Sequence, residues 1–285
     1  MSDITMIGLG AMGATLAKTF IQAGHQTTVW NRSAENIKQF QRTNAICALS
    51  LKEAIEASPI IIICIDNYDV TKQLFDDVDT GVHLEEKVLL QLSTGSPQEV
   101  STMETWASEK GAEYLDGAIM SYPDGIGKES SRLLFSGPQK TYEQCCPFLA
   151  CLGGDLRYLG ENIVAAAVLD MALLTRELCG HLATVHGALI CESEGVNINT
   201  LASMIEDEPD KLLAQTIHTD DFSNPGATIN VWDGALKKIQ SQASHRSINS
   251  EVPDLVSKLL GQAIDSGYGE EDFGAVIKAM RKTAK

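Results

Sequence analysis

Three glycines near the N-terminus have the spacing of a phosphate-binding turn. Residues 8–13 read Gly-Leu-Gly-Ala-Met-Gly and follow a short apolar run that begins at Ile4. Gly8 permits a tight turn, Gly10 lets the backbone approach a pyrophosphate, and Gly13 permits close packing of the next helix. The N-terminus of that helix would then face the negative phosphates. We therefore expect a dinucleotide site formed by Gly8, Leu9, Gly10, Ala11, Met12 and Gly13.

The residues after the second expected strand, 27–30, discriminate between the two nicotinamide cofactors. A domain that prefers NAD places Asp or Glu there to bind the ribose 2′-hydroxyl. This chain has Asn31, Arg32 and Ser33 instead, with Glu35 close by. Arg32 can pair with a 2′-phosphate and stack on adenine, and its two neighbours can donate hydrogen bonds. The sequence predicts NADPH rather than NADH, although Glu35 weakens that preference.

Further candidate residues follow two other expected strands, 59–65 and 88–92. Open α/β sheets bind ligands at the carboxyl ends of their strands. Both segments are runs of apolar residues, and polar side chains come directly after them. We expect these ends to line the cofactor site through Ile65, Asp66, Thr94 and Ser96.

The elements that position these residues alternate between strand and helix. Residues 4–9 and 27–30 are short apolar strands, 12–22 has helical spacing, and Pro97 opens a later helix. Such alternation up to about residue 160 predicts a doubly wound, mainly parallel sheet of the Rossmann type. Ser33 and Ser50 have the position and type of helix N-caps.

The pattern changes after Gly160. Residues 164–190 contain no proline and are apolar on nearly every side, which predicts one long buried helix over about 163–192. The remainder has helical spacing over 199–205, 210–217, 227–244, 252–266 and 271–282. We therefore expect an α/β chain with a Rossmann domain at 1–161 and an all-α domain at 162–285.

Composition excludes several classes of function. The formal net charge of −16 disfavours nucleic acid and anionic membrane surfaces as partners. No apolar run is long enough to span a bilayer, and no basic segment precedes one as in a signal peptide, so we expect a cytoplasmic protein. The seven cysteines and six histidines show no metal-binding spacing. We expect reduced, mostly buried thiols, no metal, and no catalytic role for the histidines without an obvious partner, which are His181, His186, His218 and His245.

Several of these segments together resemble the β-hydroxyacid dehydrogenase superfamily, whose members include 3-hydroxyisobutyrate dehydrogenase-like proteins. They are 8–13, 31–33, the Ser-Thr-Gly-Ser-Pro of 93–97 and the long helix. Three more stretches resemble the imine reductases within that superfamily. These are Tyr-Leu-Asp-Gly-Ala-Ile-Met-Ser-Tyr-Pro at 114–123, Asp-Met-Ala-Leu-Leu at 170–174 and Gly-Tyr-Gly-Glu-Glu-Asp at 267–272.

The chain departs from the hydroxyacid dehydrogenases where their chemistry takes place. Those enzymes carry a Lys on the long helix, whereas 164–190 contains no Lys and the matching position is Asp170. Their Ser-Gly-Gly substrate loop is also lost, because 116–122 reads Asp-Gly-Ala-Ile-Met-Ser-Tyr. A negative group at that place repels a carboxylate substrate and favours a cation, such as an iminium.

The resemblance implies hydride transfer from NADPH to an imine carbon. It also implies that Asp170 protonates the substrate, or stabilises it once protonated; both roles stay open. Apolar neighbours would raise the pKa of the carboxyl, which suits a proton donor near neutral pH. The alternative is an Asp170 that only caps or pairs within a buried helix.

The remaining implied contacts form the substrate pocket. The position where many imine reductases have Tyr is Leu178, and Thr94 stands where some have Asn. Tyr122 is either a replacement hydroxyl or an exposed loop residue, and Trp232 is either an active-site residue or a core aromatic. The expected substrate contacts are Met120, Tyr122, Pro123, Met171, Leu174, Leu178, Val231 and Trp232.

The resemblance further implies an interlocked homodimer in which Val231 and Trp232 act on the neighbour's cofactor. Two other functions remain open at this stage. One is a β-hydroxyacid dehydrogenase-type NADP oxidoreductase that uses unusual groups. The other is a non-catalytic NADPH-binding protein on the same fold.

Overall fold

A computed structural model describes residues 1–76 and 84–283 of the chain. The chain divides into two compact units, Met1–Asp170 and Met171–Lys285. The division falls inside the long helix α7 (Ala165–Ser193), which spans nearly the range expected from its composition. The domain boundary expected after residue 161 stays a prediction, because compactness alone does not define a folding domain.

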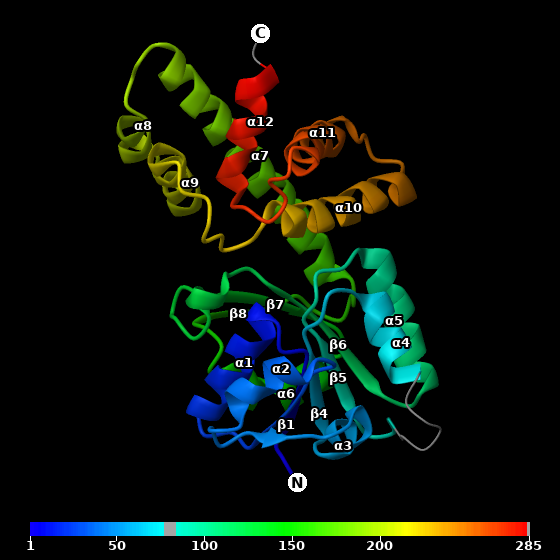
Figure 1. Ribbon diagram of the computed structural model, residues 1–285. Coiled ribbons are helices and arrows are strands. Elements are labelled where there is room, and N and C mark those ends of the chain that lie inside the picture. Colours follow the sequence, from blue (N-terminus) through cyan, green and yellow to red (C-terminus); the bar gives the residue numbers. More distant parts are fainter. Residues whose placement is uncertain (77–83, 284–285) are drawn as a thin grey trace. The chain divides into compact units, whose positions relative to one another are not determined.

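The first unit is built on one eight-stranded sheet in the order β3-β2-β1-β4-β5-β6-β7-β8 (Figure 1). Neighbouring strands are parallel except β6 and β7, which are antiparallel. The predicted doubly wound sheet is therefore confirmed. Its last two strands, β7 and β8, run opposite to the other six, because the connection 120–131 contains no crossover helix. The strands are β1 (Ile4–Ile7), β2 (Thr27–Trp30), β3 (Ile46–Cys47), β4 (Ile60–Ile63), β5 (Val88–Gln91), β6 (Glu113–Ile119), β7 (Arg132–Ser136) and β8 (Asp155–Tyr158).

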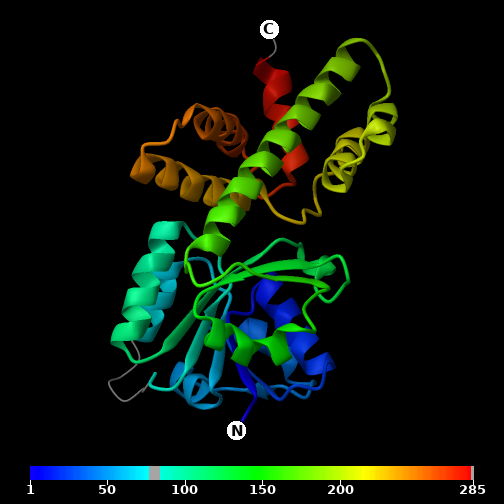
Figure 2. The ribbon, with the colours of Figure 1, turned by 180° about the vertical axis from the view of Figure 1, so that it is seen from behind.

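Helices cover both faces of this sheet (Figures 1 and 2). Strand β4 illustrates why its sequence is continuously apolar. Ile60 and Ile62 enter a core that also contains Phe20 of helix α1, whereas Ile61 and Ile63 enter a second core with Phe75 of helix α4. A central strand that is buried on both faces needs apolar residues at every position. The helices of this unit are α1 (Ala11–Gln22), α2 (Ala34–Ile37), α3 (Leu51–Glu56), α4 (Tyr68–Asp76), α5 (Pro97–Glu109) and α6 (Gln139–Leu149), with the 3-10 helices η1 (Lys38–Phe40) and η2 (Pro123–Gly125).

The second unit is helical, as predicted. After the C-terminal part of α7 it contains α8 (Ile198–Met204), α9 (Glu208–Thr219), α10 (Ile229–Arg246), α11 (Glu251–Asp265), η3 (Phe273–Ala275) and α12 (Val276–Thr283). The last helix starts later than expected, because the Asp272 carboxylate accepts a hydrogen bond from the Gly274 N–H and caps η3 first.

His181 is central to this unit, although sequence patterns gave it no partner. Its Nδ1 lies 2.7 Å from Asp210 Oδ1, so α7 and α9 are joined by a partly buried hydrogen bond. The imidazole also packs edge-on against Trp232 and Phe273, with ring centroids 5.4 and 5.1 Å away. The expectation of an unpartnered histidine was wrong, because Asp210 is close in space and distant in sequence.

The long helix is less buried within one chain than its composition predicted. Val168, Leu173 and Ile190 are 43%, 37% and 56% exposed. The expectation of burial on all sides is therefore wrong for the single chain.

The cysteines are all free thiols. Only Cys145 is fully buried and six are half-buried, so the expectation of mostly buried thiols was too strong. Burial raises the pKa of the Cys145 thiol to about 12.

Along 1–76 and 84–283 no helix combines the length and apolar character that crossing a bilayer requires. In the same residues, no three His, Cys, Asp or Glu side chains gather as metal ligands would.

Candidate cofactor and active site

Two of the three glycines in the 8–13 turn are required by the protein's own packing. Gly8 has a φ of +94°, and a Cβ there would lie 2.2 Å from the Cys64 carbonyl oxygen. A Cβ on Gly13 would lie 2.1 Å from the Gly8 carbonyl oxygen. Larger residues at either position would push β1, β4 and α1 apart, which explains both glycines without a ligand.

Gly10 differs from the other two glycines. Its φ is −65°, which every residue type adopts easily, and a Cβ placed on it would meet no atom within 4 Å. The N-terminus of α1 directly after it has no side-chain cap and no acidic residue in its first turn. An open surface with uncapped helical N–H groups fits a pyrophosphate, which would approach the backbone at Gly10.

Asn31 connects this turn to the end of β2. Its Oδ1 accepts a hydrogen bond of 2.9 Å from the Leu9 N–H, and its Nδ2 donates one of 3.0 Å to the Ser33 carbonyl oxygen. The amide thus holds the pyrophosphate turn at a fixed distance from the segment expected to bind the 2′-phosphate. The sequence predicted that the Asn31 amide would hydrogen-bond to the cofactor, but its observed partners are backbone groups of the protein.

Arg32 and Ser33 are exposed at the end of β2. In the part of the chain that the structure describes, Ser33 makes no side-chain capping bond to α2, and Arg32 is in no ion pair. Glu35 pairs with Lys38, whose Nζ lies 2.5 Å from its Oε2. The sequence suggested that Glu35 would repel a 2′-phosphate, and its pairing with Lys38 reduces that repulsion.

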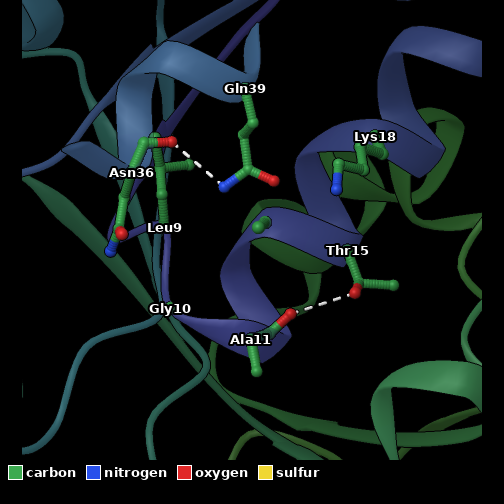
Figure 3. A pocket seen from close by; sticks show the side chains of 8 residues that line it. Leu9, Gly10, Ala11, Thr15, Lys18, Asn36 and Gln39 are labelled. Carbon is green, nitrogen blue, oxygen red and sulfur yellow. Dashed lines mark hydrogen bonds between the residues drawn. The ribbon is translucent and has the colours of Figure 1, made fainter. Parts of the chain in front are cut away.

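A cavity of about 360 Å³ lies beside the glycine turn, open to solvent (Figure 3). Gly10 and Ala11 border it at one end, and Lys18 of α1 and Gln39 of η1 line opposite sides. Lys18 therefore adds a positive charge next to the expected phosphate site. The glycine motif gives no signal for Lys18, which lies beyond its last residue, Gly13, on α1.

The two predicted strand ends are neighbours in the sheet, since Ile63 of β4 pairs with Gln91 of β5. Just beyond them, the Ile65 N–H donates to Ser93 Oγ over 3.2 Å. Asp66 and Thr94 are exposed on this edge. Ser96 is buried and forms a capping box with Glu99 at the start of α5, so its hydroxyl already has a structural partner. Cofactor contacts from these residues stay predictions.

A buried carboxyl group that the sequence did not single out lies on β6. Asp116 is 1% exposed, and its Oδ1 accepts hydrogen bonds from the hydroxyls of Tyr68 (2.6 Å) and Tyr114 (3.3 Å). Burial raises the pKa of Asp116 well above its usual value, the two tyrosine hydrogen bonds lower it, and the charge of Asp170 raises it further. Asp170, on α7, is 5% exposed. Two carboxyl groups are thus close enough in the first unit to affect each other.

The predicted substrate residues are divided between the two units. In the first unit, Met120, Tyr122 and Pro123 are half-buried where β6 leads into η2. In the second, Trp232 is buried against His181 and Phe273, and Val231 beside it is 60% exposed. Trp232 therefore has the core packing that was its alternative explanation. Met171 and Leu178 are buried on α7 and Leu174 is half-buried.

Two family models together match nearly the whole chain. One is described as the NAD binding domain of 6-phosphogluconate dehydrogenase and matches residues 3–160. The other is described as the C-terminal domain of NADPH-dependent reductive aminase-like proteins and matches residues 162–282. The NADPH-dependent reductive aminase of Aspergillus oryzae is 27% identical over 98% of this chain and 97% of its own length.

Solved structures of similar sequence point to the same family. An imine reductase from Myxococcus stipitatus in complex with NADP+ is 31% identical, covers 98% of this chain and 99% of its own, and has a TM-score of 0.68. A reductive aminase from Aspergillus terreus in complex with NADPH4, cyclohexanone and allyl amine is 30% identical. It covers 99% of this chain and 100% of its own, with a TM-score of 0.66.

The contrast between the glycines gives a direct test of the cofactor turn. We expect Gly10→Ala to leave the free energy of unfolding within about 1 kcal/mol of wild type, because its Cβ meets open space. The same methyl group should weaken NADPH binding by about tenfold or more by blocking the phosphates. Gly13→Ala is the matched control and should lower the unfolding free energy by about 2 kcal/mol through overpacking. Urea unfolding measures the free energy of unfolding, and fluorescence titration measures the affinity for NADPH. Full NADPH affinity in Gly10→Ala would contradict a pyrophosphate at this turn.

Proposed function

Since the chain belongs to the imine reductase and reductive aminase family, we propose that Asp170 is the side chain that protonates the substrate nitrogen or stabilises the iminium. The protein is an NADPH-dependent oxidoreductase that reduces C=N bonds. What remains to be assigned is the role of its individual residues. The observation that carries the assignment is a buried carboxyl group on the long helix, which has no lysine between residues 164 and 190.

The charge of this region supports a cationic reactant. A buried carboxylate is costly unless an opposite charge or hydrogen bonds stabilise it. A carboxylate attracts an iminium nitrogen, whereas the carboxylate of a hydroxy acid would add repulsion. A hydroxyacid dehydrogenase would also need a group in place of the lysine, and Asp170 is of the opposite charge.

The reaction needs one hydride and one proton for each C=N bond. When bound, NADPH supplies the hydride from C4 of its nicotinamide ring to the imine carbon. The π electrons of the C=N bond move to nitrogen, and the proton there comes from Asp170 or is already present on an iminium that Asp170 stabilises. The product is an amine, and a proton from solvent restores Asp170 where it was the donor.

The cofactor assignment extends to particular residues. We assign the pyrophosphate to the turn at Gly10 and the uncapped start of α1, which is supported by the open space there. Arg32 and Ser33 bind the 2′-phosphate, supported by their exposure and by the ion pair that engages Glu35. Ile65, Asp66 and Thr94 line the nicotinamide side of the site.

Exposed apolar residues on the long helix support a homodimer of interlocked helical domains. Val168 and Ile190 are about half exposed in the single chain, at 43% and 56%, and Val231 on α10 is 60% exposed. Burying such residues against a second copy is favourable, at roughly 25 cal/mol for each Å² removed from water. In this proposal Val231 of each copy approaches the substrate of its partner, and the dimer is cytoplasmic.

Replacement of Asp170 tests its role. Asp170→Asn and Asp170→Ala should lower kcat/KM for a cyclic imine such as 1-pyrroline by about a hundredfold or more, because general acid catalysis is lost. NADPH affinity should change less than about threefold, since the proposed contact is with substrate. Asp124→Asn removes an exposed charge from η2 and is the matched control, with expected activity near wild type. Unchanged turnover of the pyrroline in both Asp170 variants would refute the assignment.

The 2′-phosphate site is tested by comparing two neighbouring residues. Arg32→Ala should weaken NADPH binding about tenfold and leave NADH binding nearly unchanged, because only NADPH carries the phosphate. Asn31→Ala should weaken both cofactors alike, because it releases the Leu9 N–H and the pyrophosphate turn. Dissociation constants by fluorescence titration separate the two patterns. Equal losses for NADPH and NADH in Arg32→Ala would contradict the proposed contact.

Light scattering coupled to gel filtration tests the dimer. We expect a mass of twice the 30.8 kDa of one chain. Ile190→Glu should shift the population towards monomer, because a buried unpaired charge opposes association. Leu49→Glu places the same charge at an exposed leucine of the first unit and should leave the mass unchanged. A wild-type monomer at micromolar concentration would contradict the proposal.

A further inference from the structure

Asp116 is buried in an arrangement that neither the cofactor turn nor the proposed acid explains. Its partner hydroxyls come from α4 (Tyr68) and from its own strand (Tyr114), and both donate to the same oxygen, Oδ1. Phenol hydroxyls are neutral donors, so neither compensates a negative charge on this carboxyl group. A fully buried carboxylate without a cation is strongly disfavoured relative to the neutral acid.

The described groups around Asp116 include no opposite charge that would offset its burial. Tyr68 faces it from α4, Tyr114 from β6 and Asp170 from α7, while Glu104 of α5 acts on Tyr114. Burial raises the pKa of both tyrosines well above the usual value, so they stay protonated and remain donors. The negative charge of Asp170 opposes ionisation of Asp116. Among the groups of the described chain that shift the pKa of Asp116, none is a cation.

Tyr68 connects this carboxyl group to the turn after β5. A Cβ on Gly95 would lie 2.2 Å from Cε2 of the Tyr68 ring, so the ring lies directly against the backbone of that turn. The Tyr68 hydroxyl also lies 3.3 Å from the Ser93 carbonyl oxygen. Removing the acceptor on Asp116 would therefore release the side chain on which the 93–96 turn packs.

We propose that Asp116 is a positioning residue that remains a neutral acid at neutral pH and anchors Tyr68 beneath the 93–96 turn. This inference rests on the proposed role of Asp170. Were both groups ionised, their repulsion would oppose the charge that Asp170 presents to an iminium. A neutral Asp116 keeps its hydrogen bonds to the tyrosines through the carbonyl oxygen and adds no second charge.

The protonation state is measurable without catalysis. In protein labelled with ¹³C at the aspartate carboxyl carbons, one signal at pH 7 should have the chemical shift of a protonated acid. That signal should disappear in Asp116→Asn. Its titration midpoint should fall by about one pH unit in Asp170→Asn, because a neighbouring negative charge is removed. An Asp116 that is ionised at pH 7, or a midpoint that Asp170→Asn does not move, overturns the proposal.

The positioning role is measured by comparing two replacements of similar size. Asp116→Asn keeps a neutral acceptor for the Tyr68 hydroxyl. Asp116→Leu removes the acceptor that the hydroxyls of Tyr68 and Tyr114 share and leaves the Tyr68 hydroxyl only its longer, 3.3 Å contact with the Ser93 carbonyl oxygen. We expect the KM for NADPH to be about tenfold higher in Asp116→Leu than in Asp116→Asn, because a buried donor next to the turn loses its short hydrogen bond. Ser136→Ala, which lies opposite Asp116 on β7, controls for general loosening of the sheet. Equal KM values in the two Asp116 variants would refute the anchoring role.

The two proposals can fail separately. If Asp170→Asn retains full turnover while the carboxyl signal behaves as expected, the catalytic role of Asp170 is wrong and the neutral Asp116 stands. If Asp170→Asn is inactive and Asp116 is ionised at pH 7, only the positioning proposal is wrong.

Discussion

A fully buried carboxyl group, that of Asp116, is the constraint on which this part of the structure depends. Asp116 and Asp170 affect one another electrostatically, and the groups that shift the pKa of Asp116 include two tyrosines and no lysine or arginine. In a region of low dielectric constant, a negative charge on Asp170 would attract positive charge from a reactant. An imine becomes positively charged when it is protonated, so in the role proposed for Asp170 the step that activates the imine towards hydride is also the step that the carboxylate stabilises. A carbonyl substrate gains no comparable charge.

The strands that bury Asp116 also position residues predicted to contact the cofactor. Asp116 is paired with Gln91 at the end of β5, and the backbone leads from there into the 93–96 turn. Tyr68 packs against that turn while its hydroxyl reaches Asp116. Asp116, the 93–96 turn and the end of β5 are therefore packed together. A displacement of β6 relative to β5 would change the protonation equilibrium and the cofactor contacts together.

Sequence patterns were sufficient for features that depend on neighbouring residues. The isoleucines of β4 predicted a strand covered on both faces, and the glycine spacing predicted the first turn and the start of α1. Patterns failed where the structure joins distant segments. Tyr68 and Asp116 are 48 residues apart, and only the order of the strands brings them together. His181 and Asp210 are likewise distant in sequence and hydrogen-bonded in the structure. The reversed direction of β7 depends on a connection without a crossover helix. Residue type alone also did not reveal that the Asn31 amide binds the protein's own backbone.

A chain with a net charge of −16 that binds an anionic cofactor must rely on local electrostatics. At physiological ionic strength the Debye length is about 8 Å, so acidic residues far from the cofactor turn are largely screened. Close to the turn the balance is different. Arg32 is exposed outside any described ion pair, Lys18 borders the cavity, and the first turn of α1 has free N–H groups and no acid. The ion pair of Glu35 with Lys38 reduces the opposing charge of Glu35. In the proposed site, a few groups within a Debye length therefore outweigh the overall negative charge, which disfavours anionic macromolecules as partners.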